Sequence, residues 1–213
     1  MSGRTFNIAG MSAIAGWLML ILWCSYQVFT LGHFQVYAEN GLLENFQALL
    51  LVSACVIFIS AILRGQRSDK LILFACALLC YGFFLRELDV QKLDVPPLLI
   101  LLGSGSGRNL TLLLTTLLLL VMAGRNARHY VRAVKAYMRL PLFWLFLAAA
   151  VVLYLGDYFE TADALLHHEF IEEGLELLAY GLILLAALSA HLMTTLQASV
   201  MPEGIRIPAD HRH

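Results

Sequence analysis

The last long apolar segment of the chain begins with histidine and glutamate residues at helical spacing. His168, Glu172 and Glu176 follow one another at intervals of four residues, so a helix would align them in a single stripe. Glu173 lies in a second stripe beside the first, together with Glu169. Imidazole nitrogens and carboxylate oxygens bind metal ions such as zinc, and carboxylates also transfer protons. The spacing therefore predicts a polar site near the start of this segment.

Three other segments carry polar side chains that could join this site. Asn40, Glu44 and Gln47 are spaced by four and three residues at the start of the second apolar segment. Arg86 lies near the end of the third apolar segment, and Asp157 near the end of the fifth. Ionisable groups inside a membrane are costly and usually face a bundle interior or an aqueous cavity. We therefore expect these groups to converge at one end of a helix bundle.

The composition predicts the bundle to which these segments belong. Hydrophobic residues make up 60% of the 213 positions and only 14% are charged, whereas about a quarter of an ordinary globular chain is charged. Six segments qualify to cross the roughly 30 Å of membrane hydrocarbon, approximately 8–31, 42–63, 71–88, 106–124, 142–158 and 170–196. The predicted fold is an all-α polytopic membrane bundle of about six helices, forming one domain over residues 1–200.

The fourth segment gives the weakest signal of the six. A Gly/Ser stretch at 103–107 separates it from Pro96-Pro97 and the apolar residues 98–102. This leading piece is expected to be a short interfacial helix or a re-entrant turn, which a membrane tolerates where protein or water covers its backbone.

Basic residues predict the orientation of the bundle. They cluster between the second and third segments, at Arg64, Arg67 and Lys70, and again in a loop at 125–140. Six crossings put both loops on the same side as the two termini, including a polar tail at 201–213. The positive-inside rule makes that side cytoplasmic. The polar site would then face outward from the cytoplasmic (inner) membrane of a bacterium.

The leading functional hypothesis is a metal-dependent hydrolase or transferase acting on a lipid or lipid-linked substrate at the outer leaflet. The metal would be zinc, manganese or iron, and its predicted ligands are Glu44, Asp157, His168 and Glu172. Glu173 or Glu176 would act as general base, while Arg86 would stabilise phosphate or developing negative charge.

Other interpretations of the same residues remain open. An arginine–glutamate lock between helices would explain Arg86 with Glu44 or Glu176 and would need no chemistry. A carrier or channel for protons or cations would explain a glutamate stripe that enters the membrane, although the polar residues thin out further along the spans. A non-enzymatic subunit or sensor could bind a partner at the same face.

Several cofactors and partners are not expected. The Gly/Ser stretch lacks the Gly-Lys-Ser/Thr ending of a nucleotide phosphate loop. The histidines offer no clear pair for haem, and there is no long basic tail for nucleic acid. All four cysteines fall inside apolar runs, where cysteine packs as a small hydrophobe.

Overall fold

The computed structural model describes residues 3–37, 41–64, 70–88, 90, 96–160 and 167–200. Every regular element within these ranges is a helix, which confirms the all-helical prediction. In chain order the elements are α1 (Gly3–Phe29), a short 3-10 helix η1 (Phe34–Val36), α2 (Leu42–Arg64), α3 (Lys70–Glu87), α4 (Pro97–Gly103), α5 (Gly105–Arg125), α6 (Ala127–Tyr137), α7 (Pro141–Glu160) and α8 (His168–Val200). The predicted tail at 201–213 lies outside the described residues.

Four of these helices are long and apolar enough to cross a membrane. They comprise α2, α5 and the stretches Pro141–Phe159 of α7 and His168–Met193 of α8. A shorter apolar helix, Ala15–Phe29, lies within α1. The 18 residues of α3 are apolar between Lys70 at one end and Arg86-Glu87 at the other. The architecture is that of a helical membrane protein.

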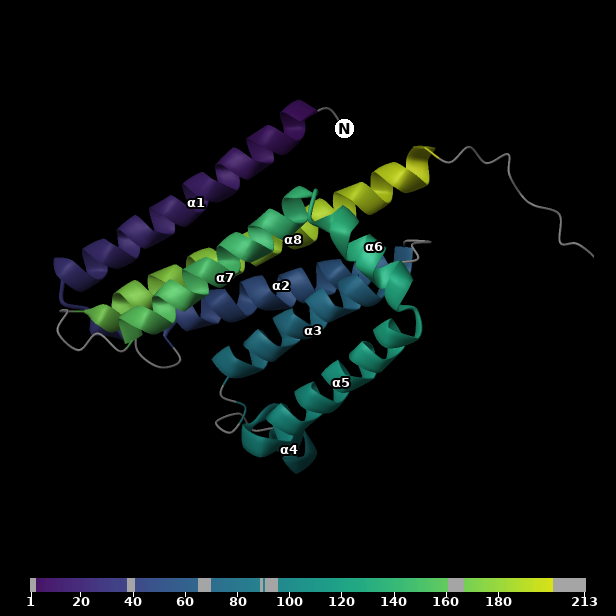
Figure 1. Ribbon diagram of the computed structural model, residues 1–213. Helices are drawn as coiled ribbons and strands as arrows, with labels where there is room; N and C mark the ends of the chain where they lie inside the picture. The colour runs from purple at the N-terminus through teal and green to yellow at the C-terminus, as the bar shows by residue number, and fades with distance from the viewer. Residues whose placement is uncertain are drawn as a thin grey trace, which may run out of the picture.

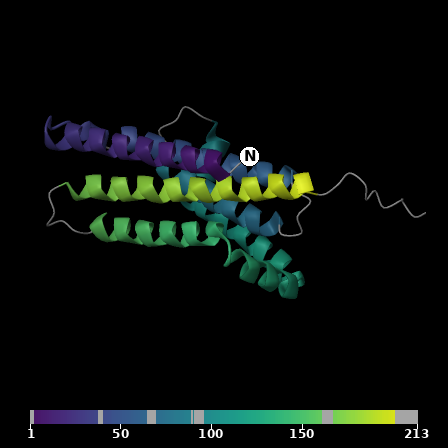
Figure 2. The same ribbon diagram turned by 90° about the horizontal axis from the view of Figure 1, so that it is seen from above.

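Helix α8 lies at the centre of the bundle (Figures 1 and 2). It packs against α7 and against α2, and α3 also packs against α2. Small residues line these contacts and are buried: Ala54, Ala77, Ala179, Ala186 and Ala187. Small side chains let helix backbones approach closely in a membrane, where dispersion contacts rather than water exclusion hold helices together.

The two ends of the bundle differ in charge. Glu44, Glu172 and Glu176 in the first turns of α2 and α8 lie at the same end as Glu87 and Asp157 in the last turns of α3 and α7. We call this the carboxylate end. The opposite, basic end carries Arg64, Lys70, Arg125 and helix α6.

Helices α1 and α5 lie at the periphery of the bundle and carry few buried residues where the structure describes their side chains. Cys24 and Val28 of α1 pack against Leu43 and Leu177 of the central helices. Helix α5 contacts α3 but has no buried residue along its length. Its apolar side chains are instead exposed on the surface of the chain, as expected for a helix in contact with lipid.

Glycines permit a close junction between α4 and α5, with only Ser104 between the two helices. Gly105 has φ +52°, a backbone conformation that costs glycine little. A Cβ atom on Gly107 would overlap the carbonyl oxygen of Leu101. The Gly/Ser stretch therefore lets the short helix α4 fold back against the start of α5.

We expect Gly107→Ala to lower the Tm of the purified protein, because α4 must move away from the added methyl group. A cost of about 2 kcal/mol corresponds to a decrease of roughly 4–8 °C for a chain of this size. Gly124→Ala in the same helix is the matched control, because a Cβ atom there meets nothing within 4 Å. Alanine favours a helix by up to about 1 kcal/mol over glycine, so the control should not lose stability. Equal Tm values for the two variants would contradict the close junction.

Candidate functional site: a carboxylate network

Polar side chains from α2, α3 and α8 meet at the carboxylate end. We call them the carboxylate network, and its members are Gln47, Arg86, Glu87, Glu173, Glu176 and Tyr180. Because the three helices pack side by side in this region, residues separated by more than a hundred positions come into hydrogen-bond contact.

Arg86 is the cation of the network. Its Nε donates to Glu87 Oε1 over 3.1 Å, and its Nη2 donates to Glu176 Oε1. The two glutamate side chains are only 6% and 7% exposed, whereas the Arg86 side chain is 50% exposed. The guanidinium thus pairs with two buried carboxylates, while part of it remains accessible from outside the network.

Tyr180 completes the connection between α3 and α8. Its hydroxyl donates to Glu87 Oε1 over 2.7 Å, so that this one oxygen accepts hydrogen bonds from both Tyr180 and Arg86. The Tyr180 side chain is fully buried. A buried hydroxyl without a partner is costly, and Glu87 supplies that partner.

Gln47 connects α2 to the same face of α8. Its Nε2 donates to Glu173 Oε2 over 2.7 Å and to the Glu173 backbone carbonyl over 3.0 Å. Gln47 is completely buried, yet its Oε1 has no hydrogen-bond partner among the described residues. The network therefore contains an unused acceptor next to Glu173. Buried polar atoms of this kind usually bind water or another group.

Carboxylates outnumber cations in the network. Glu87, Glu173 and Glu176 act on one another electrostatically, and only Arg86 compensates them within the described network. In a low-dielectric surrounding such an excess is unfavourable. A proton, a bound cation or local water can compensate the remaining charge.

The four predicted metal ligands do not form a metal site in this structure. Asp157 is exposed at the end of α7, whereas Glu44, His168 and Glu172 are half-buried near the starts of α2 and α8. Among the described residues, no group of three or more His, Cys, Asp and Glu side chains is arranged to hold a metal ion. The metal hypothesis thus gains no support from the geometry.

An aromatic cluster lies beside the network, at the turn before α8. His167 has φ 60° and makes edge-on ring contacts with Phe29 and Tyr37. The Tyr37 hydroxyl lies 3.3 Å from His167 Nδ1. Burial, followed by the negative charge of Glu169, raises the pKa of the Tyr37 phenol. These contacts hold the end of α1 against the start of α8.

Sequence reasoning assigned roles to Arg86, Glu173 and Glu176, and the structure brings all three into one network. It assigned none to Tyr180 or Glu87. Tyr180 lies four residues beyond Glu176, so it continues the stripe of His168, and this spacing was the signal that could have revealed it. Glu87 follows Arg86 directly, and its contact with Tyr180 depends on helix packing.

The chain matches no protein-family model, no curated protein and no solved structure.

We expect a double-mutant cycle to reveal coupling between Arg86 and Glu176. Arg86→Gln should destabilise the protein, because it leaves two buried carboxylates without their cation. Glu176→Gln should cost less, because Arg86 keeps its ion pair with Glu87. The double variant should be more stable than the sum of the single effects predicts, by about 1–3 kcal/mol. Thermal or denaturant unfolding of the four proteins measures this coupling.

Glu169→Gln provides the matched control for this cycle, because Glu169 is exposed and lies about two turns before Glu176 on α8. Combined with Arg86→Gln, it should give additive effects within about 0.5 kcal/mol. Additivity for Arg86 with Glu176 as well would show that the ion pair contributes no stability of its own.

Proposed function

We propose that the chain crosses a bacterial inner membrane six times, with both termini in the cytoplasm and the carboxylate end outside. On this proposal α1 and α3 join the four longer apolar helices as spans, while α4 and α6 lie at the two interfaces. Helix α6 and the adjoining helix ends concentrate lysine and arginine at the basic end. The positive-inside rule supports the cytoplasmic assignment of that end.

This topology predicts opposite labelling of two introduced cysteines. Gln35→Cys, exposed in the short helix η1, should react in intact cells with a thiol reagent that cannot cross membranes. Arg128→Cys, exposed on α6, should react only after the cells are permeabilised. The unmodified chain measures any background from its four native cysteines. Labelling of both positions in intact cells, or the reverse pattern, would refute the topology.

For the activity, we propose hydrolysis or group transfer at the head of a lipid or lipid-linked substrate in the outer leaflet. The proposal rests on Arg86, which belongs to the carboxylate network and also lines a neighbouring cavity. Arg86 pairs with buried Glu87 and Glu176, and its accessible half also lines an apolar cavity between α3 and α5. A cation at the mouth of an apolar cavity suits a ligand with a charged head and a hydrocarbon chain.

Within this proposal each network residue has a defined role. Arg86 contacts the head of the substrate and stabilises the negative charge that develops during attack. Glu173 takes the proton from the attacking water or hydroxyl group, because Gln47 occupies only one of its carboxylate oxygens. As the bond at the substrate head breaks, Glu173 returns this proton to the leaving oxygen. Glu176 is a positioning residue for Arg86. None of these roles requires a metal ion, so metal dependence is a separate hypothesis.

The carrier hypothesis has less support from the packing. Between the two ends, the described core of the central helices is formed by apolar side chains, among them Leu51, Phe58, Leu73 and Ile183. A path for protons or cations needs polar groups or water to continue through this region. No surface formed by the described residues specifically favours the partner-binding hypothesis.

The test is turnover of membrane lipids by the purified full-length protein in proteoliposomes, followed by mass spectrometry. We expect Glu173→Gln to lower the rate by about 100-fold or more, the usual contribution of a general base. Glu169→Gln, an exposed glutamate on the same helix, should leave the rate unchanged. No change in any lipid with the unmodified protein, or equal rates for both variants, would overturn the proposed activity.

A further inference from the structure

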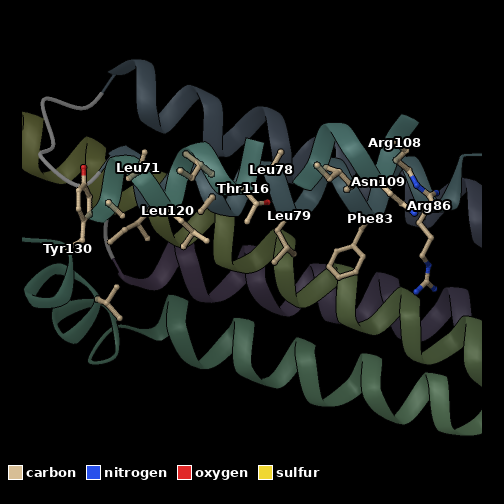
Figure 3. A pocket seen from close by; sticks show the side chains of 17 residues that line it. Leu71, Leu78, Leu79, Phe83, Arg86, Arg108, Asn109, Thr116, Leu120 and Tyr130 are labelled. Atoms are coloured by element: carbon tan, nitrogen blue, oxygen red, sulfur yellow. The ribbon is translucent and has the colours of Figure 1, made fainter. Parts of the chain in front are cut away.

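The cavity beside Arg86 extends along most of the length of α3. It has a volume of about 740 Å³ and is formed by one face of α3, one face of α5 and two residues of α6. Figure 3 shows Arg86 and Arg108 at one end, Leu79 and Thr116 in the middle, and Tyr130 at the other end. The cavity therefore runs from the carboxylate end to the basic end of the bundle.

Its walls are apolar over nearly all of this length. The lining side chains include Leu71, Leu78 and Phe83 of α3 and Leu112 and Leu120 of α5. Contact between the two helices is close near Gly82, where a Cβ atom would lie 3.4 Å from Leu112. Such walls do not hydrogen-bond water, so a hydrocarbon chain is the occupant that they favour.

The end of the cavity that carries Arg86 and Arg108 is polar. Arg108 Nη1 donates to the Leu85 carbonyl oxygen over 2.9 Å, which uses one of its five N–H groups. Arg108 forms no ion pair with any carboxylate that the structure describes. Arg86, from the facing helix, is half exposed at the same end. Two guanidinium groups from two helices suit a phosphate, whose oxygens accept forked hydrogen bonds from arginine.

The length of the cavity limits the chain of its occupant. Leu71 and Arg86 both line it and are fifteen residues apart on α3, which is about 22 Å at 1.5 Å per residue. Half of the membrane hydrocarbon is only about 15 Å thick. A chain that fills the cavity from the arginines therefore passes the middle of the bilayer, which the chains of an ordinary bilayer lipid do not need to do.

We infer that the α3–α5 cavity binds a lipid phosphate whose single chain is longer than one leaflet, with the phosphate between Arg86 and Arg108. The chain lies along α3 toward Tyr130. This inference rests on the proposed function for the outer position of the phosphate. It would stand as a binding site without any turnover.

The test measures binding of a long-chain polyprenyl phosphate to the full-length protein in detergent, by native mass spectrometry after delipidation. The uncharged polyprenol lacks the phosphate and therefore measures the contribution of the head group. Dihexadecanoyl phosphatidic acid keeps a phosphate but has shorter chains, so it measures the contribution of chain length. We expect the polyprenyl phosphate to bind about ten-fold more tightly than either, equivalent to about 1.4 kcal/mol. Equal affinity for the alcohol or for phosphatidic acid would overturn the inference.

Two variants locate the bound lipid. Ala75→Trp fills the cavity from an exposed position on α3, and Arg108→Gln removes a guanidinium that pairs with no described carboxylate. Each should weaken binding of the polyprenyl phosphate about ten-fold. The matched controls are Ala148→Trp on the exposed face of α7 and Arg125→Gln at the far end of α5, neither of which lines the cavity. Unchanged binding in both cavity variants would refute the site.

The experiments can refute the binding site and the proposed activity independently of each other. If Glu173→Gln and the unmodified protein both bind the polyprenyl phosphate but neither alters any lipid, the proposed activity is wrong and the binding site stands. If lipid turnover survives in Ala75→Trp at the full rate, the activity stands and the cavity is not where its substrate binds.

Discussion

The arrangement of this bundle depends on compensating the glutamates on α8 within an apolar surrounding. Glu173 and Glu176 lie on a helix that is packed on two sides by other helices, so the two carboxylates cannot both reach water. Arg86 supplies a positive charge from α3, and Gln47 supplies hydrogen bonds from α2. An unpaired charge in hydrocarbon would cost several kcal/mol. Helices α2 and α3 are therefore constrained to lie where these side chains can reach α8.

This constraint acts together with packing rather than in place of it. Below the network the helices touch through alanines such as Ala54 and Ala186, which permit close approach but specify rotation weakly. Polar contacts are directional. The hydroxyl of Tyr180 and the carboxylate of Glu87 meet only at one rotation of α8 relative to α3. Close packing thus gives the bundle its cohesion, and the carboxylate network at one end selects its register.

Composition and long apolar segments were sufficient to predict an all-helical membrane fold, and helical spacing indicated the end at which polar groups gather. The stripe of Glu172 and Glu176 and the cation at Arg86 were visible without coordinates. The sequence did not reveal which of these side chains contact one another, because those contacts depend on which helices are neighbours and how each helix is rotated. Asp157 illustrates this limit, since it lies at the correct end of α7 but is exposed. The α3–α5 cavity was equally invisible, because an apolar residue that faces a cavity and one that faces lipid look alike in sequence.

A structural lock and a chemical site are not exclusive explanations of the carboxylate network. A lock alone requires only that charges be paired and buried, as Glu87 and Glu176 are. It gives no reason for the guanidinium of Arg86 to remain half exposed at the end of an apolar cavity, or for Gln47 Oε1 to lack a described donor. Both features leave hydrogen-bonding capacity unused in a region where unused capacity is costly. A polar head group that carries a hydrocarbon chain would use the first. Gln47 is fully buried and does not line the cavity, so a bound water is the partner that suits its Oε1.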